Sequence, residues 1–529
     1  MTQPKGSSTV FGLATSLVVS LCTVGTAHAL DDEAGWGDDD DEAGFGGGDD
    51  DAAGFGDTPT SQPIPAAVSP PLPVTVAGFL RTEESLWTER LNDQPLAKAR
   101  QSLDLTVAYK GRRSRMLVAA HGEYDLAWRI DLDDQDVPSS EIYERDLQLR
   151  EAFLGVEFGA FDLTVGRQIV AWGEGDALSP VDVVNPRDMR EPGLADLDDI
   201  RLAVLASRVG YFHGDHRFEL MAVHEPNWGL RSPPFGEFSP LPALLSSGAD
   251  DAGGVASADA AGFLNIAAKK DVRFTHTPDE GLPDFDLDNH GWFARWVHKG
   301  DAMDLGLYAA SLLHQQGVFG SPEIRVEDLV PGGDLGLPVD HPRYTMLGHS
   351  GATASGSWLI KWEAGLDLGR PVNVLIDPTA SAEAAAAFRA AGSPLGTAEI
   401  DVLTPAIGVT YTGLSDASVT VEAQRAIVFT DPTGPGEQAF DPEAAVFAVR
   451  SSHTFLREDL TIALAGTIFG AQAEQGWLAR GEVSYKLMDG WKASAGYITY
   501  QPGDDLGLLS ALDRHDRAFA KLRWDFQVM

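Results

Sequence analysis

Apolar and polar residues alternate along the chain from about residue 74 to its end, in segments of roughly ten to thirteen residues. The connections between these segments are alternately short and long. A period of two residues predicts β-strands whose two faces meet different surroundings. In membrane β-barrels the side chains face lipid and lumen in turn, tight turns lie at the periplasmic rim, and long loops lie outside. The pattern therefore predicts an all-β protein, a transmembrane antiparallel β-barrel.

The alternation is clearest in three predicted strands, at residues 116–130, 357–369 and 477–487. In each of them the charged residues fall on one face, which is expected to line the lumen. A soluble sandwich also alternates, but its strands average about five or six residues. The residues expected on the lumen wall, in these strands and in the C-terminal one, are His121, Glu123, Lys361, Glu363, Asp367, Arg480, Glu482, Lys486, Arg523 and Asp525.

The opposite face of each strand is apolar and is expected to contact outer-membrane lipids. Trp358, Trp491 and Trp524 are predicted near the inner rim, and Trp128 and Trp477 near the outer rim. Tryptophan concentrates at membrane interfaces, so these residues predict a pair of aromatic girdles. The last strand also has the pattern expected of a C-terminal strand that the barrel assembly machinery recognises, although the chain ends on methionine rather than an aromatic residue.

The strands can be counted from the turns, because short connections rich in Gly, Asp and Ser are typical of hairpins. Short connections are predicted near residues 110–115, 158–161, 213–216, 299–301, 354–357, 412–416, 457–459 and 488–490. Longer ones are predicted around 90–98, 131–147, 171–200, 226–287, 314–341, 369–397, 430–443, 471–474 and 501–515. This arrangement predicts about 18 strands over residues 74–529 with both termini in the periplasm, and 16 strands as the alternative.

Residues 1–29 are expected to form a signal peptide. They have Lys5, an apolar run and an Ala27-His28-Ala29 cleavage site. The sole cysteine, Cys22, precedes that site, so the mature chain is expected to contain none. No later stretch reaches the length of apolar sequence that a transmembrane helix needs. An exported chain of this kind is expected in a Gram-negative outer membrane.

Residues 30–73 form an acidic, Gly-rich and then Pro-rich tail, which is predicted to be disordered because it cannot bury a core. The chain has a formal net charge of −40, so nucleic acid is excluded as a ligand. A short motif recurs around Trp36, Phe45 and Phe55. These aromatic residues are expected either to dock on a periplasmic or inner-membrane transporter partner or to belong to a simple spacer.

Residues 165–191, VGRQIVAWGEGDALSPVDVVNPRDMRE, carry a more specific pattern. They resemble the signature of the outer-membrane family filed as domain of unknown function 1302. The resemblance implies a large porin-like barrel, and relatives look like parts of transport systems that include resistance–nodulation–division type transporters for lipids or other hydrophobic molecules. The matching positions are Gly166, Gln168, Trp172, Gly173, Glu174, Asp182, Val183, Val184, Arg187, Asp188, Arg190 and Glu191.

The loop around residues 172–201 is the first candidate site. Three prolines constrain its path, and its closely spaced charges could pair with the wall and narrow the pore; alternatively, they only cap a neighbouring loop. A second long connection, 226–287, is expected to be either a plug or an extracellular lobe. The proposed constriction residues are Trp172, Glu174, Asp182, Arg187, Asp188, Arg190 and Glu191.

Catalytic and metal-binding patterns are weak in this chain. Ser350 lies in Gly348-His349-Ser350-Gly351-Ala352, which lacks the last glycine of the Gly-x-Ser-x-Gly motif. His213 and His216 flank a turn without a third ligand, and the 284–288 aspartates imitate only the start of a calcium loop. We therefore predict no enzyme, cofactor or metal centre, and expect an outer-membrane channel or conduit. A barrel hydrolase and a structural barrel without an open pore are the alternatives.

Overall fold

The computed structural model describes most of the chain from residue 74 onward. The described ranges are 74–91, 95–130, 141–193, 200–234, 236–239, 271–279, 286–320, 334–376, 395–430, 437–439, 445–504 and 508–528. The predicted signal peptide and acidic tail lie outside these residues, as does Asp284.

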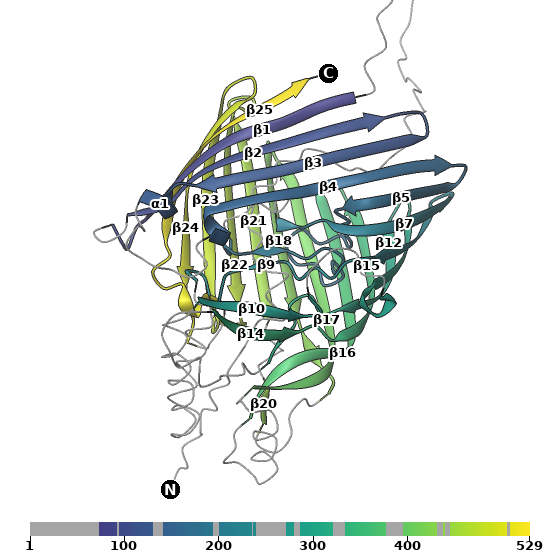
Figure 1. The fold of residues 1–529 in the computed structure, drawn as a ribbon. Helices are drawn as coiled ribbons and strands as arrows, with labels where there is room; N and C mark the ends of the chain where they lie inside the picture. The colour runs from purple at the N-terminus through teal and green to yellow at the C-terminus, as the bar shows by residue number, and fades with distance from the viewer. Residues whose placement is uncertain are drawn as a thin grey trace, which may run out of the picture.

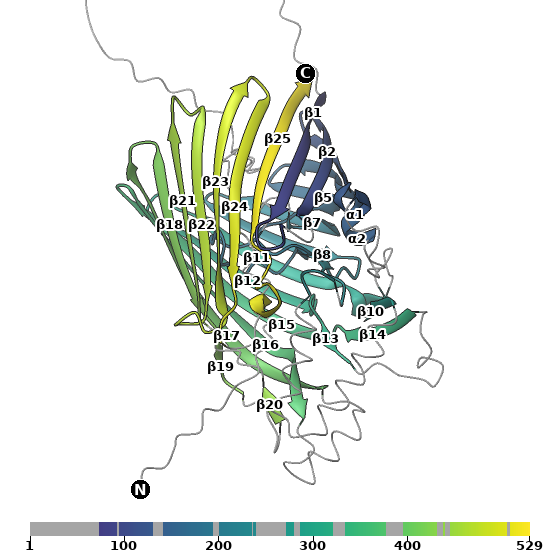
Figure 2. The same ribbon diagram turned by 90° about the vertical axis from the view of Figure 1, so that its left-hand side faces the viewer.

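One sheet of 20 strands dominates the fold, and 18 of these strands close into an antiparallel barrel (Figures 1 and 2). Each barrel strand pairs with the barrel strands before and after it, and β1 pairs with β25 to close the circle. The prediction of 18 strands is confirmed. The barrel strands are β1 (Val74–Trp87), β2 (Leu96–Lys110), β3 (Ser114–Asp125), β4 (Arg145–Phe158), β5 (Phe161–Gln168), β7 (Val204–His213), β8 (His216–Val223), β11 (Gly291–Lys299), β12 (Asp304–Leu313), β15 (Arg343–Ser355), β16 (Trp358–Ile376), β17 (Leu395–Leu414), β18 (Ala417–Arg425), β21 (Ala445–Phe455), β22 (Leu460–Phe469), β23 (Gly476–Met488), β24 (Trp491–Gln501) and β25 (Arg517–Val528).

The remaining elements are short. Strands β10, β13 and β14 form a three-stranded sheet at the long-connection end, and β6 pairs with β9. Within the described residues, no helix is long and apolar enough to span a bilayer. These elements are β6 (Asp188–Met189), β9 (Leu230–Arg231), β10 (Asp271–Thr277), β13 (Val318–Phe319), β14 (Asp334–Asp340), β19 (Ile427–Val428), β20 (Glu437–Ala439), α1 (Ala127–Ile130), α2 (Glu141–Glu144), η2 (Leu287–Asn289) and η4 (Leu508–Ala511).

All the predicted short connections join consecutive barrel strands at one end of the barrel, and that prediction is confirmed. The turn between β4 and β5 illustrates the reason. Gly159 has a φ of +64°, a backbone conformation that L side chains rarely adopt. In membrane barrels the short-turn end faces the periplasm.

The prediction of a strand over 116–130 is wrong at its end, because β3 stops at Asp125. The Asp125 carboxylate accepts hydrogen bonds from the backbone nitrogens of Ala99 and Ala127, at 2.9 and 3.0 Å, and so turns the chain out of the sheet. Trp128 then lies in α1 and stacks on Tyr143 of α2, with ring centroids 5.2 Å apart. Trp128 is therefore not a strand residue of the outer girdle.

Two predicted connections also begin or end inside strands. The sequence predicts a connection over residues 369–397, but β16 and β17 continue through much of that range. A β-bulge between Asp367 and Arg370, with Gly369 at a φ of +68°, lets the hairpin bend without ending. Similarly, β2 begins at Leu96, so Lys98 belongs to a strand rather than to the predicted connection 90–98.

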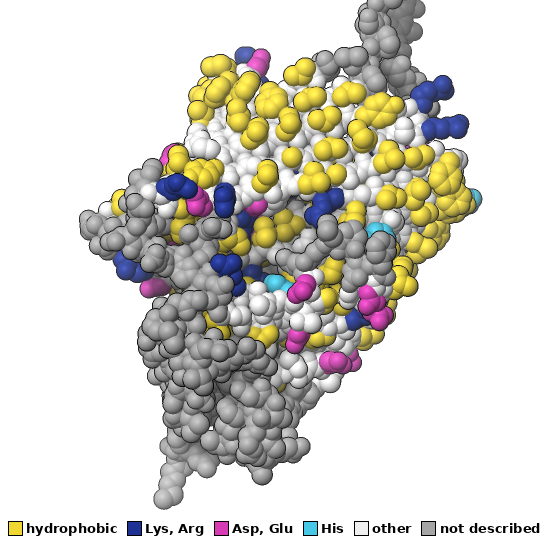
Figure 3. All heavy atoms as spheres, in the orientation of Figure 1, with side chains coloured by type: hydrophobic (Ala, Val, Ile, Leu, Met, Phe, Trp, Pro, Cys, Tyr) yellow, Lys and Arg dark blue, Asp and Glu magenta, His cyan; other side chains and the backbone are white. Residues whose placement is uncertain are grey.

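The outer surface of the barrel is covered by apolar side chains (Figure 3). Along β16 and β23, for example, Ile360 and Val483 are exposed, whereas the inward residues Glu363 and Glu482 are buried. A wall that exposes apolar side chains outward and turns charged ones inward is typical of a barrel in lipid. The barrel is therefore an outer-membrane barrel.

Candidate functional site

The connection from β5 to β7 enters the barrel and reaches the wall on the other side. Glu363, on β16, accepts hydrogen bonds from the backbone nitrogens of Glu174 and Gly175, the latter at 2.6 Å. The Ser179 hydroxyl donates to the second Glu363 oxygen at 2.8 Å. A buried carboxylate needs such donors to offset the loss of water. Glu363 thus fixes the inward connection to the wall.

A second wall carboxylate holds the next turn of this connection. Glu422, on β18, accepts from the backbone nitrogens of Asp176, Ala177 and Leu178, at 2.7, 2.7 and 3.2 Å. Lys361, near Glu363 on β16, forms a 2.8 Å ion pair with Asp176. The tip of the inward connection is therefore bound by a wall lysine as well as by wall carboxylates.

The Trp172-Gly173-Glu174 segment shapes this tip. Gly173 has a φ of +87°, and a Cβ atom there would clash with the Glu363 carboxylate, so glycine permits the close approach. Trp172 packs against Phe293 of β11, with ring centroids 5.6 Å apart. Glu174 lies 3.6 Å from the Lys299 ammonium. The segment thus contacts both β11 and β16.

Asp182 organises the connection internally. Its carboxylate binds Arg187 at 3.0 Å and Arg201 at 2.9 Å, and it accepts a hydrogen bond from the backbone nitrogen of Trp172 at 3.2 Å. Arg187 is therefore held within the connection rather than on the barrel wall. Among the predicted constriction residues, Asp182 and Arg187 keep the connection folded.

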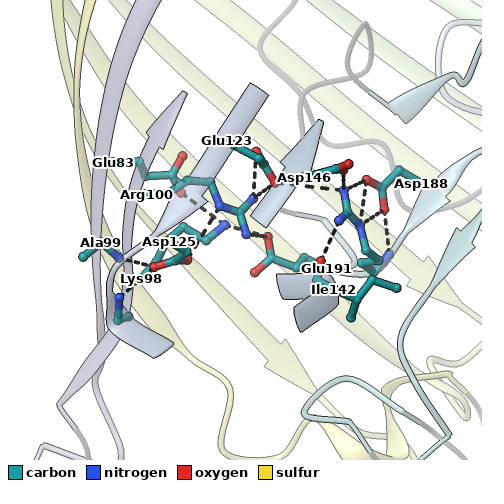
Figure 4. A network of polar contacts seen from close by, with 12 residues as sticks. Glu83, Lys98, Ala99, Arg100, Glu123, Asp125, Ile142, Asp146, Asp188 and Glu191 are labelled. Carbon is teal, nitrogen blue, oxygen red and sulfur yellow. Dashed lines mark hydrogen bonds and ion pairs between the residues drawn. The ribbon is translucent and has the colours of Figure 1, made fainter. Parts of the chain in front are cut away.

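Arg190, paired with Asp188, binds the start of β4 and the helix α2 before it. Arg190 forms 2.6 Å ion pairs with both Asp188 and Asp146, and it donates to the backbone oxygen of Ile142 at 2.8 Å. Burial disfavours the guanidinium charge, but Asp188 and Asp146 outweigh this effect and raise the pKa of Arg190. Arg190 therefore joins the inward connection to the β4 wall. Figure 4 shows its partners Ile142, Asp146 and Asp188.

Glu191 binds the wall formed by β2 and β25. It lies 2.6 Å from Lys98, 3.1 Å from Arg100 and 3.8 Å from Arg517. Burial alone would raise the pKa of Glu191, but the charges of Arg100, Lys98 and Arg517 hold it at about 2. The carboxylate is therefore ionised at any physiological pH.

These last contacts border a polar cavity of about 70 Å³ beside β1–β4 and β25. A volume of this size holds about two water molecules. Figure 4 shows its charged side chains converging from the barrel wall and from the inward connection. The lining residues are Arg81, Glu83, Lys98, Arg100, His121, Glu123, Tyr143, Asp146, Gln148, Arg150, Asp188, Arg190, Glu191 and Lys521.

The rest of the inward connection packs into two apolar cores. Leu178 lies in a core with inward residues of β21–β24, such as Leu478 and Ile498. Val181, with Trp172, lies in another core with inward residues of β7, β8, β11, β12 and β15. Such cores exclude water. Two polar parts of the lumen remain beside the inward connection. Wall carboxylates bind the connection on the β16–β18 side, and the cavity lies on the β25–β4 side.

The predicted lumen residues fall into separate groups. His121 and Glu123 line the cavity, and Lys361 and Glu363 hold the inward connection. The others form pairs on the wall elsewhere: Asp367 with Arg370 at 2.9 Å, Arg480 with Glu482 at 2.7 Å, Lys486 with Asp489 at 3.4 Å, and Arg523 with Asp525 at 2.7 Å.

Sequence reasoning missed Lys98, Arg100, Asp146 and Glu422. For Lys98 and Arg100 a signal existed, because they alternate with the outward residues of β2. For Glu422 no local signal indicates that it binds backbone nitrogens of a distant connection.

The weaker chemical candidates lie in ordinary surroundings. Ser350 is on β15 and lies 2.9 Å from the Tyr308 hydroxyl. His213 pairs with His216 across the β7–β8 turn, and His216 stacks on His298 with ring centroids 4.7 Å apart. Over the part of the chain that the structure describes, no three His, Cys, Asp or Glu side chains gather as for a metal ion.

The sequence profile described as "Protein of unknown function (DUF1302)" matches residues 92–526. The chain belongs to this family. No curated protein matches this DUF1302 member.

Solved structures that resemble the DUF1302 barrel include OccK8 (OprE) of Pseudomonas aeruginosa, with a TM-score of 0.44 and 11% identity over 86% of this chain and 98% of that one. OpdK of P. aeruginosa, solved with vanillate, has a TM-score of 0.43 and 10% identity over 86% and 99% of the two chains. OccAB3 of Acinetobacter baumannii has a TM-score of 0.43 and 10% identity over the same shares.

Proposed function

We propose that this DUF1302 barrel is an outer-membrane channel whose passage follows the charged cavity beside β1–β4 and β25. The observation that carries this proposal is the division of the lumen by the inward connection. Apolar packing occupies the β7–β15 and β21–β24 sides, whereas charged groups and a cavity remain on the other side. Water and polar solutes need a hydrated path, and the charged lining of this cavity suits one.

The cavity lining favours small polar solutes that carry both signs of charge. It contains six Lys or Arg side chains and five Asp or Glu side chains. A filter with one sign of charge would select ions strongly, whereas a nearly balanced one pairs with either end of a zwitterion. Entirely apolar cargo would have to cross this charged region unaided, which is unfavourable.

Conductance across a planar bilayer tests the proposed passage. Gln148 lies on the cavity, and Gln148→Trp should fill part of it and lower conductance. Thr420 lies two residues before Glu422 and therefore on the same inner face of β18, away from the cavity. Thr420→Trp is the matched control. Equal conductance of the two variants would contradict the passage, and a wild-type barrel that never conducts would favour a structural role.

The barrel also fits the proposal of a conduit within a larger transport system. The acidic tail would then bind a periplasmic or inner-membrane partner through Trp36, Phe45 and Phe55, which lie outside the described residues. The rival function is hydrolysis at the outer membrane. Assays with lipid and peptide substrates, compared between the wild type and Ser350→Ala, test that alternative.

A further inference from the structure

One half of β4 lies beyond the end of its neighbour β5. On one side β4 pairs with β3 from Val156 to Arg145. On the other side its pairing with β5 ends at Ala152, opposite Arg167. Among the described residues, no strand pairs with that edge of β4 over residues 145–151. The closed sheet therefore contains an open strand edge in its wall.

The cause is the turn of the chain into the lumen directly after β5. The backbone nitrogen of Ile169 donates to the Glu151 carboxylate at 2.9 Å, in place of a bond within the sheet. The next nitrogen, on Val170, donates to the Asn185 side chain at 2.7 Å. The same connection that fills the lumen therefore removes the strand that would have covered β4.

The two faces of this β4 segment have opposite chemistry. Leu147 and Leu149 point outward and are 86% and 51% exposed. Asp146, Gln148 and Arg150 point inward and line the charged cavity. A leucine this exposed is favourable in lipid and unfavourable in water. Figure 1 shows β4 running past the end of β5, and Figure 3 shows the surface hollowed below this part of β4.

The geometry points to a lateral portal in the barrel wall, between residues 145–151 and the inward connection. Through it, a lipid-like amphiphile with an acidic headgroup would enter the cavity while its acyl chain stays in the bilayer beside Leu147 and Leu149. This inference rests on the proposed passage through the cavity. It also removes the difficulty of moving an acyl chain across a charged lumen.

The cavity suits an acidic headgroup. The lining as a whole is nearly balanced in charge, but three of its basic side chains, Lys98, Arg100 and Arg190, line the same space. Carboxylate and phosphate oxygens form strong, often bidentate hydrogen bonds with guanidinium groups. The headgroup would replace Asp146 as one partner of Arg190.

Arg190 closes the portal at the end of β4 near Asp146, and the hydrogen bond from Ile169 to Glu151 closes the other end. Arg190 joins the inward connection to Asp146 and to the backbone oxygen of Ile142, at 2.6 and 2.8 Å. Side-chain contacts, those of Arg190 and the hydrogen bond from Ile169 to Glu151, therefore lie where a strand pair would have a ladder of backbone hydrogen bonds. Side-chain contacts exchange partners faster than a strand leaves a sheet.

A headgroup-reactive lipid tests the portal. Gln148→Cys is made in a chain with Cys22→Ser, so that position 148 holds the sole cysteine, and is reconstituted with maleimide-derivatised phosphatidylethanolamine. Thr420→Cys is the inward control away from the portal, and Leu147→Cys is the lipid-facing reference. A water-soluble maleimide must label both the Gln148→Cys and the Thr420→Cys variants, which shows that both are folded and accessible.

We expect the lipid reagent to label Gln148→Cys about tenfold faster than Thr420→Cys, because the bilayer raises its effective concentration at the portal. Adding Asp146→Ala, which removes the β4 partner of Arg190 and leaves its guanidinium for the headgroup, should increase the labelling rate at position 148 further. Lysophosphatidic acid should compete with labelling more strongly than lysophosphatidylcholine. Equal competition would overturn the acidic headgroup, and equal labelling rates for the two cysteine variants would overturn the portal.

Two other outcomes also count against the portal. A disulfide between two copies of the Leu147→Cys variant would show that a second chain covers the β4 edge. If Gln148→Trp lowers conductance but the lipid reagent never labels Gln148→Cys, the passage is correct and the portal is wrong. If Gln148→Cys is labelled but Gln148→Trp leaves conductance unchanged, the cavity is a lipid site and the proposed passage is wrong.

Discussion

Glu363 and Gly175 are 188 residues apart in the chain, yet the carboxylate accepts a hydrogen bond from the glycine nitrogen at 2.6 Å. This contact joins the barrel wall to the tip of the inward connection. Together with Glu422, it replaces the water that the backbone nitrogens of that tip would otherwise bind. The position of the tip therefore depends on two acidic side chains of the wall.

Replacing Glu363 with Ala should release the tip. The backbone nitrogens of Glu174 and Gly175 would lose their acceptor, at a cost of about 1–3 kcal/mol for each unsatisfied buried donor. We expect higher single-channel conductance and faster proteolysis within residues 172–190 in the variant. Asp525→Ala is the control, because that carboxylate pairs with Arg523 on the wall. If the two variants behave alike, Glu363 does not hold the tip.

Replacing Arg187, Asp188 and Arg190 together with Ser should raise conductance or loosen size exclusion. The contacts separate the contributions of these residues, because Arg187 binds Asp182 within the connection whereas Arg190 binds Asp146 near the wall. Breaking one partner out of a buried pair costs about 3–5 kcal/mol. Arg190→Ser alone should therefore reproduce most of the change. A triple variant with normal folding and unchanged conductance would exclude a constriction here.

Trp362→Arg should disrupt assembly, whereas Lys361→Gln should not. Trp362 lies on the outer face of β16, and an arginine facing lipid costs about 2–4 kcal/mol near the bilayer midplane. Lys361 faces inward and binds Asp176, so its replacement should change the channel without preventing insertion. The fraction of heat-modifiable barrel in outer membranes measures assembly. Equal fractions would mean that the assigned faces of β16 are reversed.

The sheet of β10, β13 and β14 should open at low pH. His341 donates to the backbone oxygen of His314 at 2.7 Å and lies 2.8 Å from the His276 ring nitrogen. Burial and the charge of Arg231 lower the pKa of His276 to about 4, and burial together with the charge of His276 lowers the pKa of His341 to about 3. Both rings are neutral in the folded sheet.

The unfolded rings take up protons near their ordinary pKa of 6.5. The stability from the neutral pair is therefore complete above pH 6.5 and falls as the pH drops toward 3. Amide exchange in β10 and β14 should accelerate over this range. His341→Phe keeps a ring against Trp228 but removes one titrating group, so its pH dependence should be weaker. An unchanged pH profile in that variant would contradict this assignment.

Deleting residues 30–57 should leave a folded, heat-modifiable barrel but lower partner capture in crosslinking. Repeated weak motifs raise effective concentration, so capture should fall in steps as Trp36, Phe45 and Phe55 are replaced with Ala. Deletion of the acidic residues between the motifs, with the aromatic residues retained, is the control. Full capture by the triple Ala variant would identify the segment as a spacer.

The sequence by itself determined the barrel, because both of its signals are local. Alternation shows in every strand without reference to any other, and hairpin turns need Gly, Asp or Ser within a few residues. The strand count and the positions of the short turns follow from these patterns. The end of β3 did not follow, because Asp125 breaks the alternation with a side-chain contact to Ala99, on a neighbouring strand.

Only the tertiary structure decided how the lumen is filled. The prolines and charges of residues 172–201 are compatible with a cap over a strand end or with an inward path. The inward path depends on acceptors such as Glu422, 244 to 246 residues away from the nitrogens it binds. The open edge of β4 likewise arises because β5 ends early and the chain turns inward. The periodicity of a strand shows on which face of the sheet each residue lies. The inward path and the open edge of β4 depend instead on which distant segments come into contact, and no local pattern in the sequence encodes those contacts.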